Sequence, residues 1–403
     1  MSHLPPLFSE RVNVVIFYDF EVFKEDWLAV FIDVTKKKEY VIINNPDELK
    51  ALYEANSKDI WVGYNNRHYD QYIFKGILLG MNPKRINDWI IVEKKEGWQF
   101  SSVFNKVPMI NYDVMPNPPV GLKTLEGFLG SNIKETDVDF RINRKLTKEE
   151  IEMTVFYCRH DVEETIKVFL EKIDEFNAMH GIIQAFPDIV KLSDIGDSEA
   201  RITAKVLGCS SRSFEDEFDF YFLPCLQLKK YKYVQDWFEQ KRQEALSMDL
   251  AHMDKYSKRT WYKEQGLETV VAGIPHSFGF GGVHGATATP IHKTGQLLHV
   301  DVNNYYPSML IAWGLVTRAA TNDNYPLVYN TRKAMKEKQI VAKNAGNKKE
   351  VKRWKKAQLP YKKMLNALSG AMKDESNAAY DPRNNNCMCT VSYTHLRAHE
   401  TRS

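Results

Sequence analysis

The chain has 403 residues, is 43% hydrophobic and carries a formal net charge of +3, so it can bury the cores of two or three domains. It contains no run of the ~20 apolar residues that cross a bilayer and no secretory signal pattern at its start, which leads us to expect a soluble, cytoplasmic protein with no membrane partner. Its five cysteines are odd in number and mostly far apart, which favours reduced thiols over disulfides or structural zinc.

The first part of the chain predicts an α/β domain that ends near residue 180. Apolar, β-branched runs predict strands at 12–18, 27–34, 39–45 and 59–65. Residues 69–80 repeat apolar side chains at helical spacing. Residues 146–176 predict a further helix, which starts at a Thr147-x-x-Glu150 capping signal and carries an apolar stripe made of Ile151, Val155, Val162, Ile166 and Phe169.

Acidic side chains recur at defined places on these elements. Asp19 and Glu21 end the first strand, and side chains two residues apart on a strand point to the same face. Asp70 follows the strand at 59–65 and begins a helix, while Tyr157 and Asp161 lie one helical turn apart. The pattern therefore predicts four carboxylates and one tyrosine in related positions.

In this order the three segments match the motifs D-x-E, N-x(2–3)-[F/Y]-D and Y-x-x-x-D, and the set resembles the 3′ to 5′ proofreading exonuclease domain of DNA polymerases. The resemblance implies a ribonuclease H-like fold and two Mg²⁺ or Mn²⁺ ions per active site. Such a pair, ~3.5–4 Å apart, activates water and stabilises charge during phosphodiester hydrolysis, and hard cations prefer oxygen ligands.

The resemblance also implies a role for each residue. Asp19 would bridge the two ions, Glu21 and Asp161 would complete the nucleophile-side ion, and Asp70 would hold the other. Tyr157 would orient the attacking water. The terminal nucleotide would contact Asn65 or Asn66, between which the variable motif spacing does not choose, and Tyr69 is expected to pack and to stack partly on a base.

The second half predicts a different organisation. Residues 190–265 read as mainly helical, and the Gly-rich stretch 276–287 divides the chain. A strand at 296–302 and a helix from 305 follow, and then two basic helices within 331–370, joined near 344–347. Residues 331–363 hold thirteen Lys or Arg against two Glu, which indicates either a phosphate-binding surface or a solvated Lys-rich hairpin.

Two stretches in this half resemble sequence motifs of family B DNA polymerases. The stretch "HVDVNNYYPSML" is similar to motif A, with Asp301 as the aspartate that binds both catalytic Mg²⁺ ions, Asn304 in the usual serine place and Tyr306 beneath the incoming sugar. The stretch "YKKMLNALSG" is similar to motif B, with Lys362 facing the nucleotide phosphates and Asn366 and Gly370 also matching.

Other positions fit the family less closely. Ala367 and Ser369 replace the Ser and Tyr of motif B, and Arg332 or Lys355 would give a second phosphate contact. The Gly-rich stretch 278–285 lies where the family often has a Gly-Gly element that tracks the template. The resemblance covers about residues 12–389, and its compact layout is similar to that of bacteriophage polymerases.

The chain lacks the Y-x-D-T-D motif that completes such a polymerase site. Its last residues, "VSYTHLRAHETRS", resemble the translation of a sequencing adapter, so we expect the native sequence to stop near Cys389 or Thr390 and the chain to be unable to extend a primer. The expected organisation is an exonuclease domain, a helical connector, a partial palm, fingers and an adapter-derived tail, at 1–180, 181–285, 286–325, 326–389 and 390–403.

The sequence thus predicts an enzyme of DNA replication: a DNA-directed DNA polymerase with a 3′ to 5′ exonuclease, acting on primer-template DNA, single-stranded DNA and dNTPs. Two alternatives stay open. One is a free-standing exonuclease with a degenerate polymerase half, and the other is a non-catalytic single-strand-binding protein with basic and aromatic surfaces.

Overall fold

The chain forms two compact units, with the boundary between Asp197 and Ser198. The structure is a computed structural model that describes residues 14–131, 138–211, 214, 216–224, 228–248, 254–280, 282–290, 294–296 and 304–391. It confirms the mixed α/β class. The division at 197 lies beyond the boundary expected near residue 180, which falls inside a helix. Within the described residues, no helix is both long and apolar enough to span a membrane.

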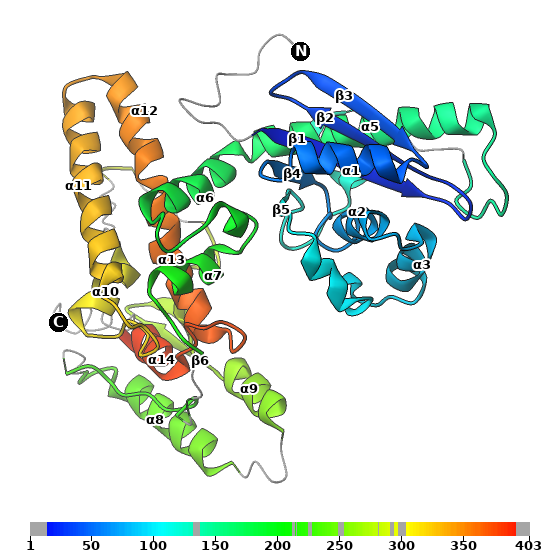
Figure 1. Cartoon of the computed structure of the whole chain (residues 1–403). Helices are drawn as coiled ribbons and strands as arrows, with labels where there is room; N and C mark the ends of the chain where they lie inside the picture. Colours follow the sequence, from blue (N-terminus) through cyan, green and yellow to red (C-terminus); the bar gives the residue numbers. More distant parts are fainter. Residues whose placement is uncertain are drawn as a thin grey trace. The chain divides into compact units, whose positions relative to one another are not determined.

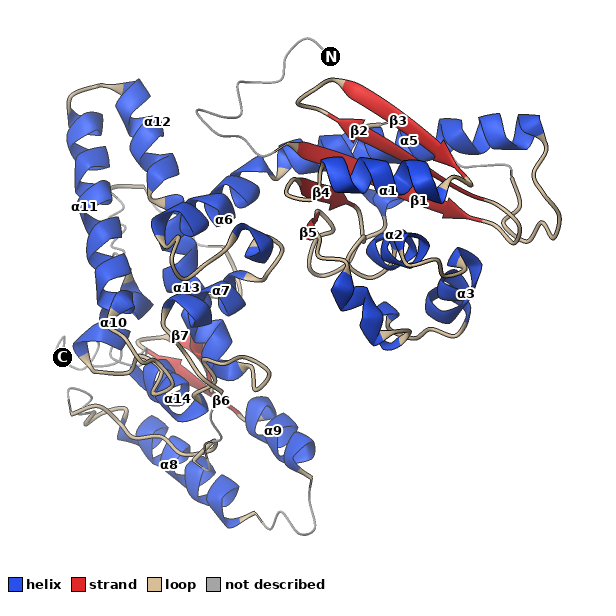
Figure 2. Ribbon diagram, viewed as in Figure 1, coloured by secondary structure: helices blue, strands red, loops and turns tan. Residues whose placement is uncertain are grey.

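The first unit is built on a mixed five-stranded sheet in the order β3-β2-β1-β4-β5 (Figures 1 and 2). Its first three strands are antiparallel neighbours, while β4 and β5 continue the sheet in parallel with β1. Four strands correspond to expected ones and β5 does not. The strands are β1 Val15–Val22, β2 Trp27–Asp33, β3 Lys38–Ile43, β4 Ile60–Gly63 and β5 Ile110–Asp113.

Helices cover both faces of this sheet. They are α1 Pro46–Ala55, α2 Asp70–Leu78, α3 Pro83–Asn87, α4 Leu122–Leu129, α5 Lys148–Glu171 and α6 Ile173–Ala185. On one face, Tyr18 of β1 packs against Phe74 of α2, with ring centroids 5.8 Å apart. On the other, Phe17 packs against Phe169 of α5 at 5.2 Å. Because side chains alternate along β1, Asp19 and Glu21 lie on the face that α5 covers.

The long helical segment predicted at 146–176 begins as expected and is divided once. Thr147 and Glu150 form the capping box, with the Glu150 amide donating to Thr147 Oγ1 at 3.2 Å and the Thr147 amide donating to Glu150 Oε2 at 2.7 Å. The helix ends at Glu171, and α6 follows. Val162 and Phe169 of the predicted apolar stripe are buried as expected, whereas Ile151, Val155 and Ile166 are only partly buried. Small or polar side chains are buried beside them, among them Thr154, Cys158 and Thr165.

The second unit combines helices with a three-stranded antiparallel sheet in the order β6-β7-β8. Tyr325 of α11 donates its hydroxyl to the carbonyl of Leu365 on α13 at 2.9 Å, which joins two of the helices. The elements are α7 Glu199–Val206, α8 Lys232–Ser247, α9 Lys255–Glu264, β6 Gly266–Val271, β7 Ile274–Gly279, β8 Gly282–Gly285, α10 Tyr305–Ala312, α11 Asn324–Asn344, α12 Lys348–Ala357, α13 Leu359–Lys373 and α14 Pro382–Val391.

Two expectations for this half need correction. The segment 181–285 is not purely a helical connector, because residues 266–285 form the sheet, and its Gly-rich stretch supplies β7 and β8. The basic region contains three helices where two were expected. The additional break precedes Pro360, which has no amide hydrogen to continue the helical ladder of α12. The expected strand at 296–302 lies outside the described residues, apart from residue 296.

An arginine holds the segment after α10 to the start of α14. Arg318 donates to the fully buried Asp381 from its backbone amide at 2.8 Å and from Nη2 at 2.6 Å. Its Nη1 donates to Asp216 at 2.8 Å. Three segments far apart in the sequence therefore meet at one guanidinium, whose planar fork suits two carboxylates.

We predict that Asp381→Ala destabilises the second unit by roughly 3 kcal/mol, because it leaves a partly buried guanidinium without its main partner. Asp236→Ala, which removes a solvent-exposed ion pair with Lys232, should cost less than about 1 kcal/mol. Urea unfolding of the full chain would compare them. Equal losses would contradict the role assigned to Arg318.

Candidate metal centre

Three carboxylates from two elements of the first unit meet at one point. Asp19 and Glu21 extend from β1, and Asp161 extends from α5, which crosses that face of the sheet. One oxygen from each carboxylate lies within 4.8 Å of the others. The alternation of β1 thus brings together the side chains that the sequence pattern paired.

Asp70 approaches the same strand from the opening of α2. Strand β4 pairs with β1 only from Val15 to Phe17, so the main chain of β1 continues beyond the end of its neighbour. The Phe20 amide donates to Asp70 Oδ1 at 3.2 Å, and Asp70 is 3% exposed. The fourth carboxylate is therefore fixed to the backbone between Asp19 and Glu21.

The turn between β4 and α2 is held by the end of β5. Asp113 accepts hydrogen bonds from the backbone amides of Asn65 at 2.9 Å and Arg67 at 3.1 Å. Asn66 is fully buried, and its Nδ2 donates to Asn111 Oδ1 at 2.9 Å. A Cβ on Gly63 would lie 2.8 Å from Asn66, so glycine is needed at the close approach.

This turn distinguishes the two asparagines that the motif left open. The Asn66 side chain is used inside the fold, whereas Asn65 is half-buried and has a left-handed backbone with φ of 57°. Of the two, Asn65 has the side chain that a nucleotide can reach. Tyr69 packs against the core as expected and donates its hydroxyl to Asn87 Oδ1 at 2.8 Å.

The electrostatics of the four carboxylates favour a cation. Burial, followed by the charge of Asp161, raises the pKa of Asp19 from 3.8 to about 7. Burial and then the neighbouring acids raise the pKa of Glu21 well above its usual range, and burial and then Asp19 do the same for the pKa of Asp70. Burial also raises the pKa of Asp161. Desolvated like charges resist ionisation together, and a divalent cation with oxygen ligands would remove that penalty.

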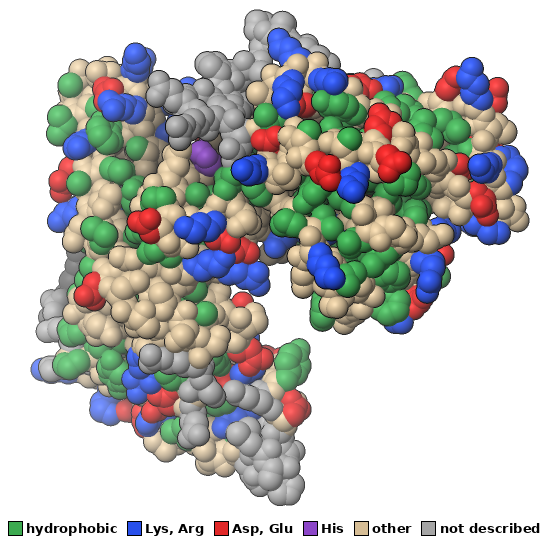
Figure 3. Space-filling view, viewed as in Figure 1, with side chains coloured by type: hydrophobic (Ala, Val, Ile, Leu, Met, Phe, Trp, Pro, Cys, Tyr) green, Lys and Arg blue, Asp and Glu red, His purple; other side chains and the backbone are tan. Residues whose placement is uncertain are grey.

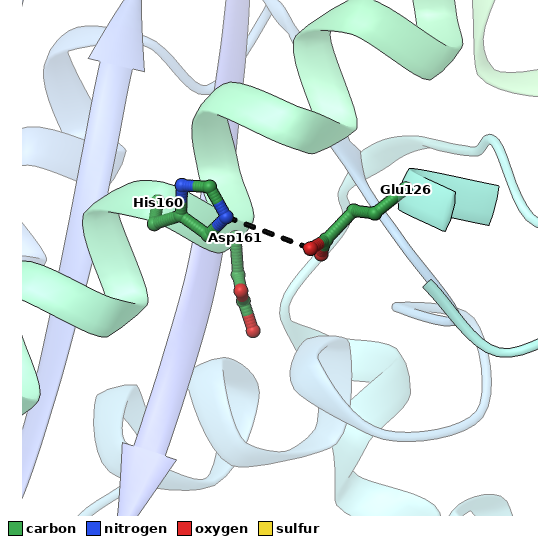
Figure 4. A group of neighbouring side chains, drawn as sticks. All are labelled: Glu126, His160 and Asp161. Carbon is green, nitrogen blue, oxygen red and sulfur yellow. Dashed lines mark ion pairs between the residues drawn. The ribbon is translucent and has the colours of Figure 1, made fainter. Parts of the chain in front are cut away.

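Several neighbours of Asp161 had no sequence motif to mark them. Lys123 Nζ lies 2.5 Å from Asp161 Oδ1 and 3.2 Å from Glu126 Oε1. His160 Nε2 lies 3.5 Å from Glu126 Oε2, as Figure 4 shows. His160 could have been noted because it adjoins Asp161, but Lys123 and Glu126 are more than thirty residues away in the chain and gave no local signal.

Cys158 is another residue near the carboxylates that the motifs did not mark. Its side chain is fully buried, with Sγ 3.4 Å from Asp19 Oδ2. It lies one turn before Val162 on the buried face of α5, where a larger side chain would displace the carboxylate. The YCRHD sequence therefore supplies a small residue that allows α5 to approach β1 closely.

Tyr157 is correctly placed on α5 but does not contact the carboxylates. It lies one turn before Asp161, is half-buried, and packs edge-on against Phe156 with ring centroids 5.5 Å apart. Within the described residues its hydroxyl has no hydrogen bond to an acid of the cluster. Its hydroxyl is thus available for a water or substrate atom.

The residues singled out by the resemblance to family B polymerases belong, where the structure describes them, to the second unit. Asp301 is outside the described residues. Tyr306 lies on α10 and is 41% exposed, and Lys362 and Asn366 lie one turn apart on an exposed face of α13. The structure does not bring Tyr306 into contact with either of these two.

The two candidates for a second phosphate contact differ in exposure. Lys355 is exposed on α12, while Arg332 is buried and donates to the side chain of Asn304. Arg332 therefore holds Asn304, the residue just before α10, and Lys355 is the accessible cation of the two.

Comparison with known proteins adds no family assignment. No protein-family model matches the chain, and a search of curated proteins finds no significant match. A functional proposal therefore depends on the geometry of the carboxylates and on the motifs.

We predict that Mn²⁺ stabilises the protein more at pH 7.5 than at pH 5. The pKa of Asp19 is about 7 in the folded chain and near 3.8 when it is unfolded. Between these values the folded state binds the extra proton, so the free energy of unfolding falls as pH rises from about 4 to about 7. Mn²⁺ should offset this loss because it binds the ionised carboxylates. Thermal unfolding with Mn²⁺ or a chelator would measure both effects.

The variant that tests this site is Asp19→Asn, which keeps the shape of the side chain and removes its charge. It should reduce both the pH dependence and the shift in Tm caused by Mn²⁺. A shift of equal size at both pH values, or an unchanged shift in the variant, would contradict the proposed cation site.

Proposed function

We propose that the first unit is a metal-dependent 3′ to 5′ exonuclease of the ribonuclease H-like class. The observation that carries the proposal is the convergence of Asp19, Glu21, Asp70 and Asp161 from three separate parts of the sequence. Their motifs resemble those of proofreading exonucleases, and the mixed five-stranded sheet is compatible with that class.

The residues present fit a pair of hard divalent cations. Asp19, Glu21 and Asp161 would hold one ion, and Asp70 together with Asp19 would hold the other. Such ions generate a nucleophilic hydroxide at neutral pH and neutralise charge on the phosphate. The protein supplies carboxylates that are fixed before substrate binds, because β1, α5 and the Phe20 amide hold them.

Two further residues would act on the nucleic acid directly. The Tyr157 hydroxyl would orient the attacking water, since it lies one turn before Asp161 and, within the part of the chain that the structure describes, has no hydrogen bond to the carboxylates. Asn65 would hydrogen bond to the terminal nucleotide from the turn after β4. Neither role needs a rearrangement of the sheet.

We propose further that the chain comes from a family B type DNA polymerase, with the second unit contributing part of the polymerase site. Lys362 and Asn366 share one exposed face of α13. Lys and Arg side chains gather around the connection between α11 and α12 (Figure 3), where phosphate groups would be attracted. Asp301 and Tyr306 would hold the metal ions and the sugar of an incoming dNTP, with primer-template DNA as the partner.

The two alternatives make different predictions. A free-standing exonuclease with a degenerate polymerase half would digest DNA without any nucleotide binding that depends on Lys362. A non-catalytic single-strand-binding protein would bind DNA through its basic and aromatic surfaces but would not digest it. The carboxylate cluster favours an enzyme over this second alternative.

We predict that the chain shortens 5′-labelled single-stranded DNA from its 3′ end in the presence of Mg²⁺. Asp19→Ala should lower the rate by at least ~10³-fold, since loss of a metal site removes several kcal/mol of charge stabilisation. Electrophoresis of the labelled products would measure this rate.

The control is Asp188→Ala, which removes an exposed carboxylate outside the cluster. It should digest DNA as the unaltered chain does. Digestion that persists with a chelator, or that survives Asp19→Ala, would refute the site assignment.

Tyr157→Phe should lower kcat about fivefold, because one hydrogen bond to the water contributes on the order of 1 kcal/mol. Its KM for DNA and the Mn²⁺-induced shift in Tm should remain as in the unaltered chain. A variant with normal kcat would remove Tyr157 from the reaction and leave the carboxylate assignment intact.

A further inference from the structure

A second group of metal-ligating side chains adjoins the carboxylate cluster and contains an imidazole. Glu126 on α4 and His160 and Asp161 on α5 each offer one ligand atom, and these atoms lie within 4.8 Å of one another. Figure 4 shows the His160 ring directed at the Glu126 carboxylate. The proofreading role proposed above uses neither Glu126 nor His160.

Both side chains are buried, and each has a polar atom without the hydrogen bond that burial normally demands. Glu126 is 0% exposed and His160 8%. Lys123 pairs with Glu126 Oε1 at 3.2 Å, whereas within the described residues Glu126 Oε2 and His160 Nε2 have no hydrogen bond. A buried imidazole nitrogen without a hydrogen bond carries a desolvation penalty, so His160 Nε2, aimed at Glu126, is an independent sign that the site accepts a ligand.

The spacing of the two groups suits a metal ion better than a direct bond. His160 Nε2 lies 3.5 Å from Glu126 Oε2, which is longer than a usual N–H···O hydrogen bond of about 2.7–3.2 Å. Ligands at about 2.0–2.1 Å from a tetrahedral Zn²⁺ lie about 3.3 Å from each other. One ion could therefore contact both atoms with little movement of the backbone.

The local charge also favours a cation. Three carboxylates surround His160: Glu126, Asp161 and Glu164. Two ammonium groups face them, with Lys123 next to Asp161 and Glu126, and Lys167 at 2.5 Å from Glu164. With a neutral imidazole, one negative charge remains uncompensated.

Lys123 competes for the same place. Its ammonium lies between Asp161 and Glu126, where a metal ion would also neutralise both carboxylates. The lysine has a flexible four-carbon stem and a third of its side chain is exposed, so it can turn outward. Occupation of the site by a metal ion then requires the ammonium to leave.

We propose that Glu126, His160 and Asp161 form a binding site for a borderline divalent cation such as Zn²⁺, distinct from the all-carboxylate cluster around Asp19. Imidazole nitrogen with carboxylate oxygens is a donor set that Zn²⁺ accepts readily, and three protein ligands leave one position open. Asp161 belongs to both groups, so the two sites are adjacent. The proposal does not require nuclease activity.

The test is a Zn²⁺ titration of the full chain in competition with a chromophoric chelator. His160→Asn should lose one site or weaken it at least tenfold, whereas Glu21→Gln, which alters only the carboxylate cluster, should leave it unchanged. The matched control is His68→Asn, because His68 also faces a carboxylate, Glu96, but both are exposed. It should bind Zn²⁺ as the unaltered chain does.

Lys123→Gln provides a second and opposite test. Removal of the competing ammonium should strengthen Zn²⁺ binding at this site, and it decides the matter if His160→Asn fails to fold. Unchanged Zn²⁺ binding in His160→Asn, equal weakening by Glu21→Gln, or no gain in Lys123→Gln would overturn the proposal.

Discussion

Repulsion among partly buried carboxylates is the constraint on which the first unit depends. Four acids are brought together on and beside one strand, where burial and proximity raise their pKa values. Like charges in a desolvated space oppose one another, so these carboxyl groups resist ionising together. Here the aromatic core on one face of the sheet and α5 on the other hold the strand rigidly. Such arrangements are typical of functional sites.

The four acids are held in three different ways, so no single element determines the site. Asp19 and Glu21 depend on strand alternation, and Asp161 on the close approach of α5 permitted by Cys158. Asp70 depends on a backbone amide that the short neighbouring strand leaves available. Lys123 also stabilises the site, because its ammonium group partly balances the negative charge of Asp161, which a metal ion would neutralise as well.

Local sequence rules predicted those features of this site that depend on residues close together in the chain. The spacing of Asp19 and Glu21 placed both on one face, and the capping box at Thr147 set the start of α5. Long-range contacts had no such signal. Glu126 and Lys123 meet Asp161 only because α4 packs beside α5, and β5 contributes Asp113 to the turn before Asp70 from a segment that no periodicity marked.

In the second unit, too, local patterns predicted some features, whereas long-range contacts gave no signal in the sequence. Helix α10 and the turn within the basic region followed from local patterns. The sheet at 266–285 was missed because its glycines resemble a linker, although here they lie in paired strands. The role of Arg318 depends on Asp216 and Asp381, which are too far apart in the chain for any pattern to connect them.

The most direct test of the central claim is a crystal structure of the chain grown with Mn²⁺, with anomalous scattering used to locate the ion. A peak among the oxygens of Asp19, Glu21 and Asp161 is the result predicted here. A well-ordered cluster with no Mn²⁺ at these carboxylates would contradict the claim that the first unit is built to hold divalent cations.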